Sequence, residues 1–360
     1  MSQLIYILFF SIVMMLSKVY ESISVNTNLK KISTFAIWIF IIIFVSIRYD
    51  VGNDYSSYVG HFWYINNANG FITPDYIVFE FLSYVFSFSE YGYIGVFSLY
   101  FIFTFSLIFN FLKKNNIVLW GLFVFFTFGM FFDSLDRIRQ VAALAVFIYT
   151  FEDIEKNNFF RFFIKIIVAS LFHFSAFILL PFYFIAKLPI NKIISFLWFF
   201  ILLIGFLLGL WSNLIEYIYS YIPYYNTLYQ DSMYSEKIDK LGTGLGFIGK
   251  SLFIYLNVLL SPIHNKYKVL LMIGLTFYII GVGNLNIERV SDYFLAITLI
   301  SFPFFVKYFT KLENKIIIVT PMILFLLVFF ITNLNQEYFK YQTIFSTEFQ
   351  EQKFRDRIYK

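Results

Sequence analysis

Long apolar stretches recur along this chain, and they restrict its fold more than any other feature does. About twelve stretches are long enough to form helices in a bilayer, and they lie near 3–17, 33–47, 93–112, 117–132, 138–151, 159–172, 174–187, 193–211, 246–262, 267–283, 289–308 and 315–332. Because 60% of the 360 residues are hydrophobic and only 14% are charged, most helices must face lipid or one another. The sequence therefore predicts an all-α, polytopic transmembrane helical bundle that forms a single integral membrane domain over 1–360.

Three regions of the chain are expected to depart from a simple membrane-spanning helix or to need separate interpretation. Residues 4–17 have no preceding basic stretch and no small-residue cleavage site, so we expect a retained helix and not a signal peptide. Residues 75–91 are typical of an amphipathic helix that lies along the outer interface of the membrane. Residues 159–172 and 174–187 are short for a bilayer of about 30 Å, and His173 alone separates them. They are expected to form a tight hairpin or half-membrane helices, with His173 at the turn.

Cysteine and histidine usage limits the chemistry. The chain contains no Cys, which excludes disulfides, thiolate metal ligands and a thiol nucleophile. Its three histidines, His61, His173 and His264, are too scattered in sequence to indicate a metal site. We therefore expect neither a metal site nor a cofactor.

Basic residues are concentrated in alternate connections between the apolar stretches. These connections contain Lys18, Lys30, Lys31, Lys113, Lys114, Lys156, Arg161, Lys165, Lys187, Lys192, Lys266, Lys268, Lys307, Lys311 and Lys315. The positive-inside rule makes them cytoplasmic. The net charge of +5 is thus explained by topology, and no nucleic-acid partner is expected. The N-terminus, the loop 212–245 and the polar tail 333–360 are predicted to be outside, although the basic residues of the tail fit that side poorly.

The first polar cluster on the predicted outer side follows the second apolar stretch. Gly52-Asn53 requires a turn, so Asp50 and Asp54 are expected on a constrained loop beside Arg48. An arginine fork suits phosphate, and a nearby carboxylate could orient it or act as a general base. The alternative is an arginine at the membrane boundary that simply pairs with an aspartate.

The second cluster spans residues 133–140. Helical spacing would place Arg139 and Gln140 on one face with Asp136, pointing into a packed bundle. That arrangement indicates ligand binding, and the alternative is an ion pair that marks a helix start. Arg137 is the more structural of the two arginines.

Three further polar segments complete the outer side. His173 could accept a proton from a hydroxyl group or hydrogen-bond a phosphate, although a lone histidine is more often a packing residue. Arg289 is expected beside Asp292 and Tyr293 on a helix, either as a site or as a self-satisfied ion-pair cluster. The Tyr-rich loop 212–245 could stack on sugar rings, but Tyr is also common at membrane interfaces.

Four motifs in order resemble a known family. Arg48-Tyr-Asp-Val-Gly52-Asn-Asp54-Tyr55-x-x-Tyr58 resembles the R-x-x-x-G-x-D-Y-x-x-Y signature of EpsG-like proteins, which are exopolysaccharide and O-antigen repeat-unit polymerases of Wzy type. The resemblance continues with Arg139-Gln140-x-x-Ala143, His173-x-Ser175-Ala176 and Glu288-Arg289-x-x-x-Tyr293-Phe294. Each motif is modest alone, but four in order are fairly specific.

The resemblance implies a glycosyltransferase of the bacterial inner membrane with its active site outside. Such enzymes transfer a glycan from undecaprenyl diphosphate to the terminal sugar of an incoming lipid-linked repeat unit. Its expected partners are lipid-linked donor and acceptor oligosaccharides, membrane lipid, a flippase and a chain-length regulator. The roles that follow are diphosphate binding by Arg48, Arg139 and Arg289, base catalysis by Asp54 or His173, and positioning by Asp50, Asp136, Gln140, Asp292 and Tyr293.

Two other functions compete with this prediction. A flippase or exporter of lipid-linked oligosaccharides also needs cations facing a diphosphate, but it should expose polar residues along the whole transmembrane path. This sequence concentrates them at one end, which favours an enzyme. An O-antigen ligase would use comparable Arg and His chemistry with a different acceptor.

Overall fold

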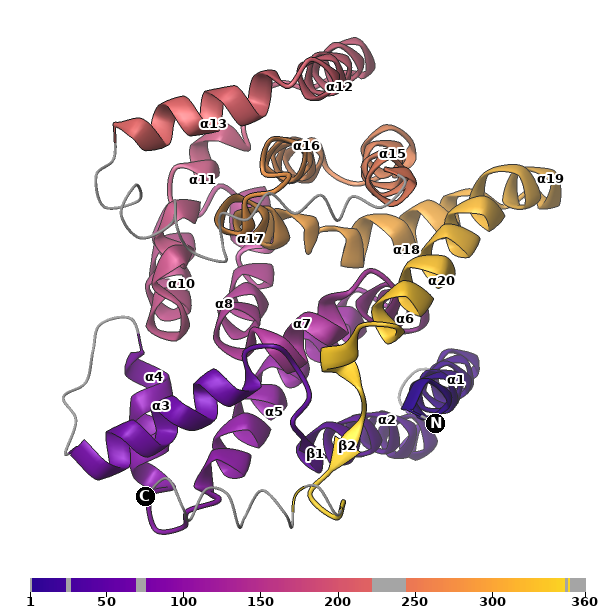
Figure 1. Cartoon of the computed structure of the whole chain (residues 1–360). Coiled ribbons are helices and arrows are strands. Elements are labelled where there is room, and N and C mark those ends of the chain that lie inside the picture. Colours follow the sequence, from indigo (N-terminus) through magenta and orange to yellow (C-terminus); the bar gives the residue numbers. More distant parts are fainter. Residues whose placement is uncertain (1, 24–26, 69–75, 222–243, 347–348, 350–360) are drawn as a thin grey trace. The chain divides into compact units, whose positions relative to one another are not determined.

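The computed structural model describes residues 2–23, 27–68, 76–221, 244–346 and 349, and they are nearly all helical (Figure 1). Four of the described helical segments are long and apolar enough to cross a membrane, and the number rises to seven if each of three bent helix pairs is one span. This confirms the predicted class of protein. Several of the other predicted stretches form shorter helices, so length and composition support fewer spans than the roughly twelve predicted.

The described chain divides into two compact units. Unit 1 comprises Met1–Tyr149, Ile164–Phe177 and Leu326–Lys360, and unit 2 comprises Thr150–Phe163 and Ile178–Phe325. The elements of unit 1, including the parts of three helices that belong to it, are α1 (Ser2–Ser22), α2 (Asn28–Ser46), β1 (Arg48–Tyr49), α3 (Tyr55–Ala68), α4 (Ile77–Val85), α5 (Gly92–Lys114), α6 (Val118–Thr127), α7 (Met130–Asp136), α8 (Ile138–Ile148), the later part of α10 (Phe159–Phe172), most of the 3₁₀ helix η1 (Phe174–Leu179), the later part of α20 (Thr320–Leu334), the short 3₁₀ helix η3 (Glu337–Phe339) and β2 (Gln342–Thr343).

Helix α5 is the centre of unit 1, where it packs against α2 and α8 and, near its start, against α3 and α4 (Figure 1). Every residue of α8 is buried. The small side chains Ala142, Ala143 and Ala145 let this helix approach its neighbours closely, as expected for helix packing in a membrane. Phe9 of α1 and Phe44 of α2 stack at 3.7 Å between ring centroids, which fixes the first helix pair.

One end of unit 1 gathers the segments predicted to be outside. The Tyr341 backbone N–H donates to Ser2 Oγ (2.6 Å), and the Tyr341 hydroxyl donates to the Phe44 carbonyl (2.7 Å). At the other end of α1, Glu21 accepts a hydrogen bond from the Leu119 N–H (3.1 Å), and Lys30 lies over the Tyr20 ring at 4.6 Å. Within unit 1, the start of the polar tail therefore lies at the end opposite Lys30.

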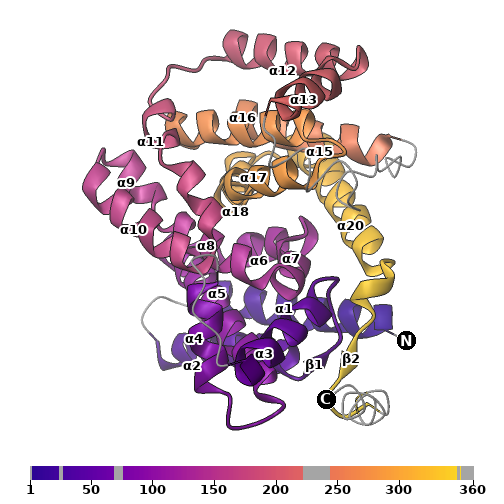
Figure 2. The ribbon, with the colours of Figure 1, turned by 60° about the vertical axis from the view of Figure 1, so that its left-hand side comes forward.

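Unit 2 is a second group of short helices. Its elements, including the parts of shared helices that belong to it, are α9 (Phe151–Glu155), the start of α10, the end of the 3₁₀ helix η1 (Phe174–Leu179), α11 (Phe182–Ile185), α12 (Lys192–Leu207), α13 (Leu210–Ser220), α15 (Leu245–Leu260), α16 (Asn265–Ile280), α17 (Leu285–Leu295), α18 (Thr298–Tyr308), α19 (Leu312–Asn314), the π-helical turn η2 (Lys315–Val319) and the start of α20. Helix α16 packs against α15 and α17, and these helices lie side by side in both views (Figures 1 and 2).

The prediction of a loop over 212–245 is wrong at its beginning. Residues up to Ser220 belong to α13, which follows α12 after a sharp bend of 81° at Gly209. The apolar side chains Trp211, Leu214, Ile215 and Ile218 recur at helical spacing, and this pattern favours a helix. Residues 222–243, which contain several of the Tyr of the predicted loop, lie outside the described residues.

Candidate functional site

The loop between α2 and α3 is held against α7. Its first residues form the antiparallel β1–β2 pair, in which Arg48 faces Thr343 and Tyr49 faces Gln342. Gly52 has a φ of +112°, and a Cβ atom there would lie 2.8 Å from the Leu135 carbonyl oxygen. Only glycine accommodates both the left-handed backbone and this close approach. The turn predicted at Gly52-Asn53 is therefore confirmed, and its purpose is to bring the loop onto α7.

Asp136 joins the two motifs across the fold. The backbone N–H of Asp54 donates to Asp136 Oδ1 (2.8 Å), just before α3 begins at Tyr55. A carboxylate at this position satisfies an otherwise unpaired N–H at a helix start and interacts favourably with the helix dipole. The side chain of Asp136 thus positions α3, which carries much of the site.

The predicted helical face over residues 133–140 is wrong. Helix α7 ends at Asp136, Arg137 has a ψ of 57°, and α8 begins at Ile138. Arg137 forms an ion pair with Asp133, four residues earlier, which agrees with its predicted structural role. Because the chain turns at Arg137, residues on either side of it no longer share a helical face.

Arg48 is a buried cation with spare hydrogen-bonding capacity. Its exposed fraction is 4%, and its Nη2 donates to the Leu135 carbonyl (3.0 Å) at the C-terminal end of α7. Within the described part of the chain, its Nε and Nη1 have no hydrogen-bond partner. Burial lowers the pKa of the Arg48 guanidinium to about 10, so it remains charged at neutral pH. A buried charge with unused donors is costly, and an anionic ligand would offset that cost.

Arg139 lies in an aromatic environment close by in unit 1. Its guanidinium carbon is 3.4 Å from the centroid of the Tyr76 ring and 5.8 Å from that of Tyr58, whose hydroxyl it hydrogen-bonds. Burial raises the pKa of Tyr58 to about 12, so its hydroxyl remains protonated. A flat guanidinium against an aromatic face is held in one orientation, which suits recognition of an oxyanion.

A histidine and a buried glutamate, which were absent from the predicted site, lie beside Arg139. His61 Nε2 is 3.3 Å from Glu80 Oε1, and the side chains are 25% and 3% exposed. The His61 ring is 4.3 Å from the Tyr76 ring, the same ring that contacts Arg139. Glu80 lies on the buried face of α4 with Phe79 and Ser83. The sequence feature that could have indicated this pair is Glu80, an acidic residue on the apolar face of the interfacial helix predicted over 75–91.

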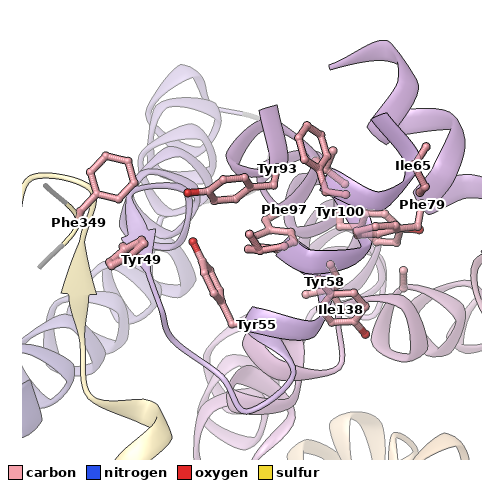
Figure 3. Packing of buried hydrophobic residues seen from close by; sticks show 14 residues of the cluster. Tyr49, Tyr55, Tyr58, Ile65, Phe79, Tyr93, Phe97, Tyr100, Ile138 and Phe349 are labelled. Carbon is pink, nitrogen blue, oxygen red and sulfur yellow. The ribbon is translucent and has the colours of Figure 1, made fainter. Parts of the chain in front are cut away.

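Aromatic side chains form a buried cluster in unit 1 (Figure 3), and rings of this cluster lie next to both arginines. Tyr55 packs edge-on against Phe97 (5.0 Å), and Arg48 lies 5.9 Å from the same Phe97 ring. Tyr49 packs against Phe349 of the tail at 4.8 Å. Figure 3 shows these rings arranged around α5, from which Phe97 and Tyr100 project. The tail, which carried no recognised motif, thus contributes to the surroundings of Arg48.

The other predicted residues of unit 1 have different surroundings. Asp54 is half-buried at the start of α3, whereas Asp50 is exposed and has a positive φ of 49°. Gln140 is 4% exposed in the first turn of α8. His173 is half-buried at the turn between α10 and η1, as predicted, and the preceding Phe172 packs against Tyr100 at 5.9 Å.

The fourth predicted motif lies in unit 2. Arg289 and Asp292 are half-buried on α17, which Asn284 caps, and Tyr293 is completely buried. Lys250 and Tyr278 are additional polar residues here that the sequence did not single out. Lys250 Nζ lies 4.6 Å from the Tyr278 ring, and Tyr278 is near the carboxylates of Glu288 and Asp292. Unit 2 therefore holds its own group of charged and aromatic side chains.

The family model for EpsG proteins matches residues 31–343. The chain belongs to the EpsG family. It is therefore a membrane protein of polysaccharide biosynthesis, from a family associated with polysaccharide polymerisation. No curated protein and no solved structure matches the chain.

In this EpsG family member, the first signature motif holds the loop before α3 in place and also directs two of its side chains to the interior. Gly52 permits the contact with α7, and the Asp54 N–H receives its cap from Asp136. Arg48 and Tyr58 face the interior, where Tyr58 meets Arg139 of the second motif. Two arginines, carboxylates and aromatic rings thus converge at one end of unit 1, and such a set can bind a diphosphate and a sugar.

Proposed function

We propose that this EpsG family protein is a glycosyltransferase that polymerises oligosaccharide repeat units carried on undecaprenyl diphosphate. The observation that carries the proposal is the pair of buried arginines in unit 1, Arg48 with two unpaired donor nitrogens and Arg139 stacked on Tyr76. Their positive charge would stabilise the diphosphate as it leaves the donor sugar. The adjacent tyrosines would contact the sugars.

The transfer needs one proton acceptor besides these cations. A hydroxyl oxygen of the acceptor sugar attacks the anomeric carbon of the donor glycan, and the bond from that carbon to the diphosphate oxygen breaks. The diphosphate keeps the bonding electrons, and a base takes the hydroxyl proton. Asp54 and His173 are the bases proposed from the sequence, with Asp50, Asp136 and Gln140 as positioning residues. Asp136 could act through the cap that it provides to α3.

The cellular setting belongs to the same proposal. We propose that the protein is a single integral domain of the bacterial inner membrane with roughly twelve membrane segments, and that the Arg48 loop faces the outside. Its partners would be lipid-linked donor and acceptor oligosaccharides, a flippase and a chain-length regulator. From its motif, Arg289 is proposed as a further diphosphate-binding residue, with Asp292 and Tyr293 as positioning residues. The role of Arg289 is tested separately with Arg289→Ala.

The test measures glycan chain length in cells with the wild-type gene, a deletion or Arg139→Ala, with surface and lipid-linked polysaccharide separated by size. Single repeat units on the outer face without a ladder are expected in the deletion and in Arg139→Ala. Arg161→Ala is the matched control, because Arg161 is exposed on α10. Immunoblotting confirms equal protein amounts.

The competing functions predict different results in the same experiment. Repeat units trapped on the cytoplasmic side of the deletion strain would indicate a flippase and overturn the proposal. Polymer of normal length that is no longer joined to its final acceptor would indicate a ligase. A normal polysaccharide ladder in cells with Arg139→Ala would show that Arg139 is not part of the site.

A further inference from the structure

The His61–Glu80 pair is a buried arrangement that none of the four family motifs contains. His61 lies on α3, two helical turns beyond Asp54, and Glu80 lies on α4, whose start at Tyr76 faces Arg139. The Glu80 carboxylate is 3% exposed and accepts a hydrogen bond from His61 Nε2 at 3.3 Å. Because a carboxylate partner orients an imidazole and stabilises its protonated form, this geometry resembles the base half of a catalytic triad.

We propose that His61 is the base that takes the proton of the attacking sugar hydroxyl, and that Glu80 is the positioning residue that orients it. The proposal rests on the proposed function and replaces Asp54 and His173 in the role of base. Nε2 carries the hydrogen that is donated to Glu80, so Nδ1 receives the proton. As the new glycosidic bond forms, the electrons of the broken bond leave with the diphosphate.

Accessibility and location both favour this role. The His61 side chain is 25% exposed, so a substrate can reach it, whereas Glu80 is shielded. Tyr76 contacts both the His61 ring (4.3 Å) and the Arg139 guanidinium (3.4 Å), so the base and a phosphate-binding cation share one neighbour. A donor diphosphate on Arg139 would therefore hold its sugar near His61, as an attacking hydroxyl requires.

The protonation state of His61 is also suitable. Burial lowers the pKa of the imidazole below its usual 6.5, and the positive charge of Arg139 acts in the same direction. The carboxylate of Glu80 opposes these effects. The groups that face His61 are Glu80 and Tyr76 from the α4 segment, Arg139 from α8 and Tyr64 on α3. The imidazole is therefore neutral at pH 7 and can accept a proton.

The test uses the full-length protein in lipid nanodiscs with the undecaprenyl-diphosphate-linked repeat unit of its native strain. Polymer formation is measured from pH 5 to 8, and binding of the repeat unit is measured separately. His61→Gln retains an amide N–H for Glu80 but no basic nitrogen. We expect it to reduce the rate at pH 7.5 about 100-fold, to remove the acid limb of the pH profile and to leave binding unchanged.

Glu80→Gln provides a second readout, a shift of the pH profile, which misfolding of the variant would not produce. Removing the carboxylate removes the charge that raises the pKa of His61, so the acid limb should move to lower pH. His264→Gln is the matched control, because His264 is exposed at the start of α16. Its rate and pH profile should equal those of the wild type.

The contrary outcomes separate the two proposals. A wild-type rate and acid limb in His61→Gln, with Arg139→Ala inactive, would overturn the base assignment and leave the proposed function intact. Equal losses of binding and rate in His61→Gln would also overturn it, because the residue would then be structural. Absence of polymer with the wild-type protein, while bound repeat units remain unchanged, would overturn the proposed function itself.

Discussion

At the residue scale, Arg48 and Arg139 are buried for different reasons. Arg48 donates to a helix C-terminal carbonyl and keeps two donors unused, whereas Arg139 is held flat against the Tyr76 ring. Arg48 therefore offers a positive charge with free donor groups, whereas the guanidinium of Arg139 is held in one orientation. A substitution that keeps the positive charge but loses the planar guanidinium should therefore affect the two positions differently.

Arg139→Lys should reduce polymerisation although it preserves the charge. An ammonium group cannot reproduce both the stack on Tyr76 and the hydrogen bond to Tyr58, and the lost interactions amount to about 1–2 kcal/mol, or roughly 10-fold in rate. The measurement is the rate of polymer formation in nanodiscs, with Arg161→Lys on the exposed side of α10 as the control. An unchanged rate would mean that the planar fork is not required.

Gly52→Ala should destabilise unit 1. The new Cβ would lie 2.8 Å from the Leu135 carbonyl at a φ of +112°, and such strain costs about 1–3 kcal/mol. Thermal unfolding in detergent, followed by loss of the monodisperse chromatographic peak, should occur several degrees lower. Gly60→Ala is the control, since a Cβ there meets nothing within 4 Å. Equal stability of the two variants would contradict this account of the turn.

At the element scale, the β1–β2 pair connects the polar tail to the first signature motif. The Ile344 N–H donates to the Ile47 carbonyl (3.0 Å), and the Gly52 N–H donates to the Tyr338 carbonyl (2.8 Å). These bonds fix the backbone on both sides of Arg48. The tail is thus part of the site's scaffold, although its sequence contains no motif.

Ile344→Pro should loosen the Arg48 loop and lower activity without abolishing membrane insertion. Proline removes the N–H that bonds Ile47, a loss of about 1 kcal/mol, and also restricts the residue before it. Ile344→Ala keeps the N–H and serves as the matched control. Limited proteolysis of the 336–346 segment should be faster in the proline variant, and equal rates in both variants would refute the role of the strand.

At the scale of the whole molecule, the distribution of lysines and arginines determines the predicted orientation in the membrane. Within unit 1, the tail and the Arg48 loop lie at one end, while Lys30 lies with Tyr20 at the other. Charged side chains are rarely buried in a membrane protein without a function. The proposed binding site accounts for those that are buried at the predicted outer end.

The absence of Cys allows a direct test of this orientation. Single-cysteine variants Ser57→Cys and Lys31→Cys change exposed positions of α3 and α2. In cells whose outer layer is permeabilised but whose inner membrane is intact, a membrane-impermeant maleimide should label Ser57→Cys. It should label Lys31→Cys only after the inner membrane is disrupted. The reverse pattern would invert the proposed topology.

Much of the membrane architecture could be read from local sequence. Apolar length predicted α1, α2 and α5 closely, and the turn at Gly52 followed from the residues themselves. The short helices α3 and α13 were missed, because mixed polar and aromatic segments at an interface carry a weak apolar signal. The stretches 117–132 and 138–151 were predicted to be separate, but the helical face expected over residues 133–140 overlooked the turn at Arg137, since no proline or glycine marks it.

The sequence by itself determined that this is a membrane protein of the EpsG family, because hydropathy, charge alternation and motif spacing are local properties of the chain. Tertiary structure alone decided which polar groups meet. Asp54 and Asp136 are 82 residues apart, and Arg48 meets a tail strand near residue 343. His61 and Glu80 come together only through the packing of α3 and α4. Such contacts depend on how helices pack against one another, which no local pattern encodes.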